Sequence, residues 1–346
     1  MSDTPIRIGI IGAGAIVKRR HLPGFRDIPD CEVVAVHNRR SANAEAVAKE
    51  WGIPNVVDSP EAVYGRDDIN VVLVGTTPYL HRDLTLAALE AGKHVFCQAR
   101  MSRNLAEARD MLAAAEKHSD LVTMICPAPR ADPVDSYIQQ LLKEGALGEI
   151  RLVRVQHLSD LALDPATEFH WRMDKDVSGN QIQTLGQYVE ILNRWFDQAI
   201  SVSAWGKVFT QQRKDAETGE MKEALVPETV CVSGELKNGA HIVYTFSAVA
   251  PCSTGEHIEI YGTEGALAYT PGDQQLRMGK AGSGAMEPLA VPEGMGREWT
   301  VEADFVSAIR QGTSVYPNFR DGLAYMEFME AVALSLEQGK TITLPL

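Results

Sequence analysis

Short runs of apolar, often β-branched residues alternate with amphipathic stretches over the first 125 residues of the chain. The apolar runs lie at residues 6–11, 31–36, 70–75, 94–97 and 121–125. Alanine, leucine and charged residues recur at helical spacing between them, at residues 41–51, 83–91 and 104–118. Continuous apolar strands that alternate with helices are typical of a parallel sheet covered on both faces. The pattern therefore predicts a doubly wound α/β domain over residues 1–125.

The pattern changes after the proline-rich segment 126–133. A helix is predicted near residues 133–144, and the strands predicted after it lie at 150–157, 230–236, 240–248 and 257–262. Lys237-Asn238-Gly239 separates two of these strands and indicates a hairpin turn, because Asn and Gly tolerate positive φ angles. These features predict a second sheet that is largely antiparallel.

The C-terminal part of the chain completes this second region. Glycine, proline and methionine are frequent at residues 271–298, which suggests surface loops. Two helices are predicted near residues 300–311 and 319–337. Residues 126–346 are therefore expected to form an α+β domain with an open, mainly antiparallel sheet. Because such a sheet has one bare face that usually needs a cover, we expect a homodimer or homotetramer to form through it.

A glycine-rich turn lies where the first predicted strand meets the following helix. The sequence IGIIGAGAI places Gly12, Gly14, Ala15 and Ile16 there as candidate cofactor contacts. One glycine permits a tight turn, and the other lets the backbone approach a pyrophosphate at a helix N-terminus. Val17 stands where the full fingerprint has a third small residue. The position after strand one favours dinucleotide binding, and a purely structural turn is the alternative.

The end of the second predicted strand carries no carboxylate that could hold both ribose hydroxyls of NAD. It reads His37-Asn38-Arg39-Arg40 instead. An amide followed by guanidinium groups suits a 2′-phosphate, since Arg pairs bidentately with phosphate oxygens. We therefore expect Asn38 and Arg39 to bind NADP, with NAD as the other possible cofactor. The alternative is that the two arginines form a solvated approach to a helix.

The chain is acidic, with 46 Asp and Glu residues against 33 Lys and Arg residues and a formal net charge of -13. This charge repels phosphate backbones and anionic lipid surfaces, so nucleic acid and membranes are not expected partners. No run of about eighteen apolar residues occurs, and the start lacks a secretory-signal pattern, so we expect a cytoplasmic protein. The five cysteines are scattered without CxxC spacing, which indicates neither a disulfide framework nor a metal site.

Five longer segments follow one another along nearly the whole chain: IRIGIIGAGAIVKRRHLPGF, VGTTPYLHRDLTLAALEAGKHVFC, LLKEGALGEIRLVRV, HWRMD and FRDGLAYMEFMEAVALSLEQGKTITL. Together they resemble the glucose-fructose oxidoreductase/inositol dehydrogenase/MocA (Gfo/Idh/MocA) family. The resemblance implies an NAD(P)-binding Rossmann domain over residues 1–125. It also implies a substrate-binding and oligomerisation domain over residues 126–346, and hydride transfer between a nicotinamide cofactor and a sugar or polyol.

The strand at 94–97 ends differently from the strand that it resembles. In the family it usually continues Glu-Lys-Pro, where Glu contacts the nicotinamide ribose and Lys assists hydride transfer. Here those positions are Gln98, Ala99 and Arg100. The Gln98 amide can still hydrogen-bond a ribose, whereas Ala99 can neither donate nor accept a proton. The resemblance therefore implies a site without its usual cationic partner.

A second family motif, a Gly-rich turn followed by a helix bearing Asp and then His, resembles VSGNQIQTLGQYVEIL at residues 177–192. Thr184 occupies the Asp position and Tyr188 the His position. A spacing of four keeps both residues on one helix face, so both are expected at the ligand. Some branches of the family also carry Tyr at the second position, but they keep the Lys. The family segment Gly-Phe-Asn-Arg-Arg reads Cys-Pro-Ala-Pro-Arg here, at residues 126–130.

Tyr188 is the leading candidate for the acid or base. A phenol with an ordinary pKa of about 10 needs a neighbouring cation to ionise near neutral pH. Arg100, Arg172 or Lys175 is expected to supply that cation, and a core-facing aromatic is the alternative. His170 is the second candidate, because an imidazole has a pKa suited to proton transfer, and a structural histidine is its alternative.

Several other residues match family positions on the cofactor side. Arg172 resembles the Arg of a family Trp-Arg pair and is expected to bind the cofactor or a substrate anion, with a surface salt bridge as the alternative. Thr76, Tyr79 and His81 match a segment that lies along the nicotinamide in the family. His157 lies at the end of a predicted strand facing the expected cleft, but its spacing is not diagnostic.

The leading hypothesis is an NADP- or NAD-dependent oxidoreductase that acts on a polyhydroxylated, sugar-like substrate. Its candidate catalytic residues are Tyr188, His170, Thr184 and Arg100. Two alternatives stay open. In the first, a tightly held nicotinamide oxidises a sugar transiently, so that elimination, hydrolysis or epimerisation can follow. In the second, the protein binds a dinucleotide or a sugar without turnover, which the loss of the family's Lys, Asp and His would explain.

Overall fold

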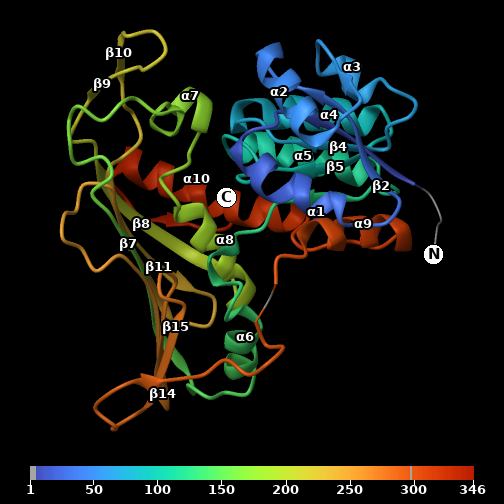
Figure 1. The fold of residues 1–346 in the computed structure, drawn as a ribbon. Coiled ribbons are helices and arrows are strands. Elements are labelled where there is room, and N and C mark those ends of the chain that lie inside the picture. The colour runs from blue at the N-terminus through green and yellow to red at the C-terminus, as the bar shows by residue number, and fades with distance from the viewer. Residues whose placement is uncertain (1–4, 297) are drawn as a thin grey trace. The chain divides into compact units, whose positions relative to one another are not determined.

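The computed structural model describes residues 5–296 and 298–346, which fold into two compact units (Figure 1). The N-terminal unit comprises Met1–Pro127 and Thr300–Leu323, and the C-terminal unit comprises Ala128–Trp299 and Ala324–Leu346. The sequence-based division after residue 125 assigns 300–323 to the second domain, whereas the packing groups this segment with the first. In this segment, the ring of Phe305 packs on that of Phe96, with centroids 5.5 Å apart, and Glu302 contacts His21.

In the described part of the N-terminal unit, six strands form one parallel sheet in the order β3-β2-β1-β4-β5-β6. The strands are β1 (Ile6–Ile11), β2 (Cys31–His37), β3 (Asn55–Val56), β4 (Val71–Val74), β5 (His94–Cys97) and β6 (Thr123–Ile125). All four residues of β4 are buried, as expected for a strand covered on both faces. The predicted doubly wound sheet is confirmed, and its order is that of dinucleotide-binding folds.

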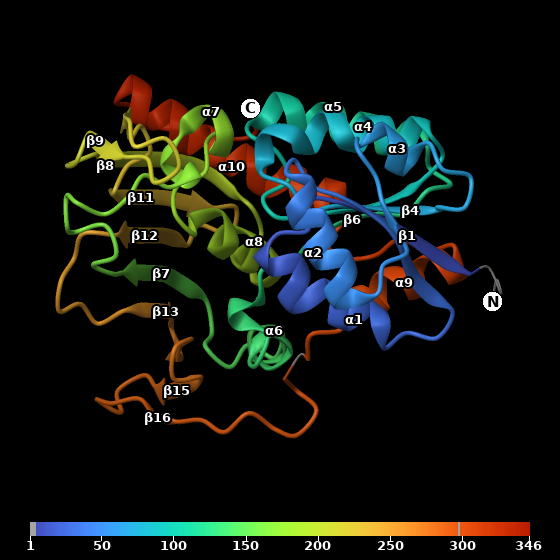
Figure 2. The same cartoon turned by 45° about the horizontal axis from the view of Figure 1, so that its top comes forward.

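Helices cover both faces of this sheet. They are α1 (Leu22–Arg26), α2 (Ser41–Trp51), α3 (Glu61–Tyr64), α4 (His81–Glu90), α5 (Leu105–Lys117) and α9 (Val301–Gln311). Figure 2 shows α4 and α5 on one face, and α1 and α9 on the other. A π-helical turn, η1 (Val17–His21), leads into α1, and a 3₁₀ turn, η2 (Pro78–Leu80), leads into α4.

Among the described residues of the C-terminal unit, nine strands form one large sheet in the order β16-β15-β14-β13-β7-β12-β11-β8-β17. The strands are β7 (Ile150–Leu158), β8 (Ala199–Lys207), β11 (Thr229–Leu236), β12 (His241–Ser247), β13 (Glu256–Gly262), β14 (Gly265–Thr270), β15 (Gln275–Lys280), β16 (Glu287–Pro288) and β17 (Ile342–Thr343). β7 and β12 pair in parallel and the other neighbours pair antiparallel, so the predicted mainly antiparallel sheet is confirmed. A separate hairpin joins β9 (Gln212–Lys214) to β10 (Met221–Glu223).

Two local predictions in this unit have different outcomes. The hairpin at 237–239 is confirmed, because Leu236 N–H donates to the Ala240 carbonyl at 2.8 Å and Gly239 has a φ of 85°. The interpretation of 271–298 as loops is wrong for β15 and β16. These are short strands near the edge of the sheet, and they lack the continuous apolar run by which buried strands are recognised.

Two helices cover one face of the large sheet, α8 (Leu185–Trp195) and α10 (Phe319–Gln338), the second of which begins in the N-terminal unit. Tyr188 of α8 packs on Phe246 of β12, and Phe328 of α10 packs on Tyr244, with ring centroids 5.5 and 5.6 Å apart. The opposite face carries Trp205, which is 61% exposed. The remaining short elements are η3 (Pro129–Ala131), α6 (Asp135–Lys143), η4 (Trp171–Met173) and α7 (Lys175–Ser178).

None of the helices in residues 5–296 and 298–346 combines the length and apolar composition needed to cross a membrane.

Candidate active site

The two glycines of the turn after β1 differ in the space around their Cα atoms. Gly12 has a φ of 91°, and a Cβ atom there would lie 2.8 Å from the backbone nitrogen of Thr76. Gly12 is therefore required by the fold itself, because the loop after β4 passes against it. At Gly14 a Cβ atom would meet no protein atom within 4 Å. The backbone at Gly14 is thus open to close approach by a ligand, which fits a pyrophosphate at this turn.

The end of β2 is tied to the glycine-rich turn. Asn38 accepts a hydrogen bond from the Ala13 N–H through its side-chain oxygen, at 2.7 Å. Its oxygen therefore holds the turn in place, and its NH₂ group stays the predicted contact to a cofactor phosphate. Arg39 and Arg40, which follow, are exposed. Arg39 stays the candidate phosphate ligand.

His81 joins the loops that follow β4 and β5. It is fully buried, and its ring nitrogens face backbone oxygens, with Nδ1 3.0 Å from the Arg100 oxygen and Nε2 3.0 Å from the Thr76 oxygen. Burial lowers the pKa of His81, which keeps the ring neutral. A neutral ring has one N–H and donates to only one of these carbonyls. Its full burial between the two loops leaves His81 no exposed surface for the predicted cofactor contact. Tyr79, on the same segment, is 36% exposed and stays a predicted cofactor contact.

Gln98 at the end of β5 belongs to a buried polar group that the sequence did not indicate. Its amide nitrogen contacts Nε2 of His21, and its amide oxygen accepts from the Ala99 N–H at 3.2 Å. Nδ1 of His21 lies 2.5 Å from a carboxylate oxygen of Glu302, and both of those residues are buried. The amide of Gln98 is thereby held in one orientation beside the predicted ribose position. Arg100, two residues further, is itself buried.

The C-terminal unit brings together a polar cluster of five side chains, from four elements. Glu256 of β13 lies at its centre: one carboxylate oxygen accepts from Arg130 and lies 3.2 Å from Nε2 of His157, and the other accepts from Tyr188 at 2.8 Å. Nδ1 of His157 contacts the hydroxyl of Thr184. The predicted pair Thr184 and Tyr188 is thus brought into one cluster. Sequence reasoning missed Glu256 and Arg130 and left His157 without a role.

The protonation state of Tyr188 differs from the predicted one. Its side chain is fully buried against Phe246, and burial together with the negative charge of Glu256 raises its pKa. Arg130, whose guanidinium carbon lies 5.9 Å from the ring centroid, opposes this shift without overcoming it. The expectation that a cation promotes ionisation of Tyr188 is therefore wrong. The phenol stays neutral and donates its proton to Glu256 as a hydrogen bond.

His170 and Arg172 lie together at η4. His170 is exposed, its Nδ1 accepts from the Arg172 N–H at 3.2 Å, and the Arg172 guanidinium stacks 4.2 Å from the Trp171 ring centroid. Partial burial and the charge of Arg172 lower the pKa of His170. Within the described part of the chain, His170 makes no hydrogen bond to Tyr188. The two candidate acid–base residues are therefore not hydrogen-bonded to each other.

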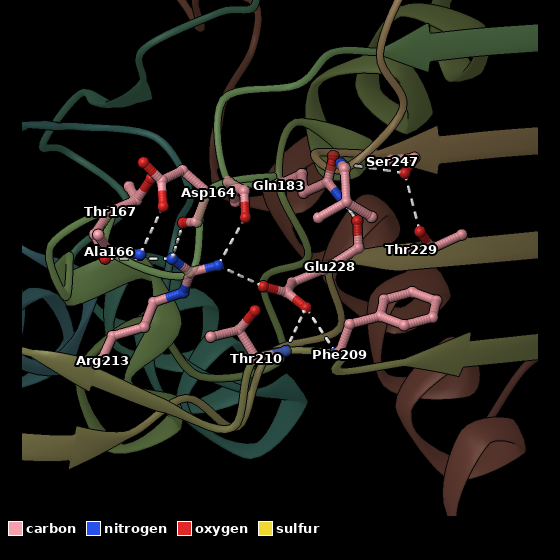
Figure 3. Close-up of polar contacts among 12 residues, drawn as sticks. Asp164, Ala166, Thr167, Gln183, Phe209, Thr210, Arg213, Glu228, Thr229 and Ser247 are labelled. Atoms are coloured by element: carbon pink, nitrogen blue, oxygen red, sulfur yellow. Dashed lines mark hydrogen bonds and ion pairs between the residues drawn. The ribbon is translucent and has the colours of Figure 1, made fainter.

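A buried ion pair between Arg213 and Glu228 holds the backbone on either side of η4 (Figure 3). Arg213 is fully buried and donates to Glu228 at 2.7 Å, and its guanidinium also donates to three backbone carbonyls, those of Ala162, Asp164 and Thr167. The carbonyl of Glu228 accepts from the side chain of Gln183 at 2.8 Å. Because Gln183 precedes Thr184, this ion pair anchors the start of α8. Burying both charges is tolerated since they pair with each other and accept or donate further hydrogen bonds, although Nε of Arg213 has no hydrogen-bond partner in the described part of the chain.

Among residues 5–296 and 298–346, no group of three or more His, Cys, Asp or Glu side chains is arranged to hold a metal ion.

Both halves of the chain match known families. Residues 6–125 match the family described as "Oxidoreductase family, NAD-binding Rossmann fold", and residues 136–268 match the "GFO/IDH/MocA C-terminal domain". Levoglucosan dehydrogenase of Pseudarthrobacter phenanthrenivorans is 26% identical over 98% of this chain and 98% of its own length. Trans-1,2-dihydrobenzene-1,2-diol dehydrogenase of Bos taurus is 30% identical over 75% of this chain and 72% of its own length.

The fold is also shared with solved structures. Levoglucosan dehydrogenase in complex with NADH and L-sorbose superposes with a TM-score of 0.88 at 23% identity, covering 98% of this chain and 99% of that one. An oxidoreductase domain protein from Kribbella flavida superposes with a TM-score of 0.87 at 25% identity, covering 99% of this chain and 100% of that one. With both of its domains matched in order, the chain belongs to the Gfo/Idh/MocA family of oxidoreductases.

Proposed function

We propose that the protein is an NAD(P)-dependent oxidoreductase that transfers a hydride between its nicotinamide cofactor and a sugar-like or polyol substrate. The observation that carries this proposal is the turn at Gly12 and Gly14, which follows β1 in a sheet of the order 3-2-1-4-5-6. The open backbone at Gly14 supports dinucleotide binding rather than a purely structural turn. Family membership supports the same activity.

The residues around this turn fit a dinucleotide. Gly12, Gly14, Ala15 and Ile16 would hold the pyrophosphate at the helix start, and Ala15 and Ile16 are exposed there. Gln98, with its amide orientation fixed by His21, would hydrogen-bond the nicotinamide ribose. Thr76 and Tyr79 are further proposed contacts, and so is Arg172 in the C-terminal unit. When bound, the nicotinamide supplies the acceptor or donor of the hydride.

NADP is the proposed form of the cofactor. Residues 37–40 offer no carboxylate to hold two ribose hydroxyls, and Arg39 presents an exposed guanidinium that suits a 2′-phosphate. The side-chain oxygen of Asn38 is already used by the turn, so Asn38 would contribute its amide NH₂.

A polyhydroxylated substrate is supported by relatives and by the polar cluster. Relatives of this chain are named as dehydrogenases of levoglucosan and D-apiose and as a reductase of 1,5-anhydro-D-fructose. The cluster around Glu256 offers donors, acceptors and a charge pair in one place, and hydroxyl groups can use both donors and acceptors. In this proposal Tyr188 acts as a neutral hydroxyl that orients Glu256. We further propose a cytoplasmic homodimer or homotetramer that buries the exposed face of the large sheet.

The test combines calorimetry and spectroscopy on the full chain. Titration with NADPH and NADH is expected to show saturable binding, and a panel of sugars, anhydrosugars and polyols is expected to give a net change in nicotinamide absorbance. Absence of dinucleotide binding would overturn the proposal. A cofactor that copurifies and turns over sugars without net absorbance change would replace it with a redox-neutral reaction, and binding without turnover would indicate a sensor.

A further inference from the structure

Thr184 occupies a helix start without capping it. It is the residue before α8, a position where a Thr hydroxyl usually accepts from a backbone N–H of the first turn. Here the side chain makes no such cap, and the hydroxyl contacts Nδ1 of His157 on β7 instead. The opposite ring nitrogen of His157 faces Glu256 at 3.2 Å. A hydroxyl, an imidazole and a carboxylate therefore stand in line.

We propose that Thr184, His157 and Glu256 form a proton relay that takes the proton from the substrate hydroxyl during its oxidation. The proposal rests on the oxidoreductase function proposed above and names the group that moves the proton in it. Such a relay replaces the amine that Ala99 lacks, because a hydroxyl backed by an imidazole can accept a proton while it donates its own.

The direction of the relay follows from the partners of Glu256. Its carboxylate accepts from Arg130 and from the Tyr188 hydroxyl, which orient it. A carboxylate beside Nε2 of His157 places the ring proton on Nε2, since a carboxylate can only accept. Nδ1 then carries no proton, and its lone pair accepts a hydrogen bond from the hydroxyl of Thr184. With its proton on Nε2, His157 can act as a base toward Thr184 through Nδ1.

His157 is neutral in this arrangement. Burial lowers its pKa, with Arg130 of η3 acting in the same direction and Glu256 of β13 opposing both. The other titratable group that faces the ring is Tyr188 of α8, whose phenol is neutral. A neutral imidazole can accept a proton from Thr184, and the imidazolium formed is stabilised by the carboxylate of Glu256.

Oxidation removes one proton and one hydride from the substrate. The proton of the substrate hydroxyl passes to the oxygen of Thr184, and the proton of Thr184 passes to Nδ1 of His157. A bound oxidised nicotinamide would accept the hydrogen of the substrate carbon together with its bonding electron pair, and the carbon–oxygen bond would become a carbonyl. His157 later releases its extra proton to solvent, which restores the relay.

Conservative variants test the relay in the full chain. Thr184→Val keeps the shape but removes the hydroxyl, and we expect sugar oxidation to fall by about 100-fold or more while NADPH affinity stays within about twofold. Thr184→Ser should restore the rate to within about fivefold of the original, because the hydroxyl returns. Thr313→Val, at an exposed threonine in the N-terminal unit, is the matched control and should leave both values unchanged. A fully active Thr184→Val protein would overturn the proposal.

The pH dependence provides a second readout. The rate of oxidation should fall on the acid side as His157 gains a proton, at a pH below the ordinary histidine value of 6.5. His157→Gln should remove this acid limb together with most of the rate. An acid limb that persists unchanged in His157→Gln would contradict the relay.

Nitrogen NMR of the labelled protein decides the tautomer without any turnover. We expect His157 to carry its proton on Nε2 at neutral pH, and Glu256→Gln to shift the ring toward the other tautomer. His157→Gln assigns the signal, and His241→Gln, at an exposed histidine of β12, is the control. A charged ring or an Nδ1-protonated ring at neutral pH would overturn the relay even if the enzyme oxidises sugars. Failure of the proposed function would show separately, as absence of dinucleotide binding.

Discussion

The hydroxyl of Tyr188 donates to Glu256 at 2.8 Å, so the phenol in the family's histidine position holds a carboxylate rather than facing one of the predicted cations. Removing it with Tyr188→Phe should lower turnover by about tenfold, the value of one hydrogen bond to a charged group, and leave cofactor affinity unchanged. Steady-state rates and calorimetry check this. A loss of several orders of magnitude would instead make Tyr188 the group that transfers the proton.

The two glycines of the first turn should respond differently to substitution. The Cβ atom of Gly14→Val would meet no protein atom within 4 Å, so the variant should fold with little change in stability but lose dinucleotide affinity by at least about tenfold. Gly12→Ala combines a φ of 91° with contacts under 3 Å to Thr76 and should lose more than about 1 kcal/mol of unfolding free energy. Urea unfolding and calorimetry separate the two effects. Equal cofactor affinity in Gly14→Val would argue for a turn with no ligand.

The cofactor preference should depend on Arg39. NADPH is expected to bind at least about tenfold more tightly than NADH, and Arg39→Ala should bring the two affinities together by weakening NADPH alone. Affinity for NADH serves as the internal control, since it lacks the phosphate. Titrations of both cofactors measure the difference. Equal affinities in the unsubstituted protein would show that Arg39 is a solvated surface residue.

Breaking the Arg213–Glu228 pair should strongly destabilise the C-terminal unit. Arg213→Met leaves the Glu228 carboxylate buried without its guanidinium, and we expect a loss of about 3–5 kcal/mol in unfolding free energy. Lys214→Met, at the exposed neighbour, is the control and should change stability by less than about 0.5 kcal/mol. Urea denaturation followed by circular dichroism reports both values. If the two variants are equally stable, the pair contributes little.

Stability should fall as the pH is lowered below the ordinary histidine pKa of 6.5, in part because of His81. Its pKa is lowered by burial in the folded protein, so below 6.5 the unfolded chain binds a proton that the folded chain does not. The slope from this one residue is at most about 1.4 kcal/mol per pH unit and ends at the folded pKa. His81→Gln should flatten the pH dependence of the urea midpoint, whereas His241→Gln should leave it unchanged. The same slope in both variants would contradict the assignment.

The sequence predicted those features that a local pattern encodes. β1, β5 and the glycine-rich turn follow from apolar runs and from glycine spacing within about ten residues. The Asp and His positions of the family motif led to Thr184 and Tyr188, which lie in one cluster of the structure. In these cases the chain itself keeps the residues close, so periodicity is sufficient evidence.

The sequence could not predict the partners of those residues. Glu256 and Arg130 are 126 positions apart, and the pair His21 and Glu302 is separated by 281. No periodicity links such positions, since register in the sheets and helix packing bring them together. The pKa of Tyr188 was misjudged for the same reason, because the charge beside it comes from a distant strand.

The return of residues 300–323 to the N-terminal unit has a practical consequence for chimeras. Glu302 reaches His21, and a Cβ atom at Gly24 would strike Glu302, so this late segment is fitted to the first helix side chain by side chain. Exchange of nucleotide-binding halves between relatives must therefore transplant two stretches of chain together. A graft that ends at Pro127 would leave the new half without the helix shaped to it.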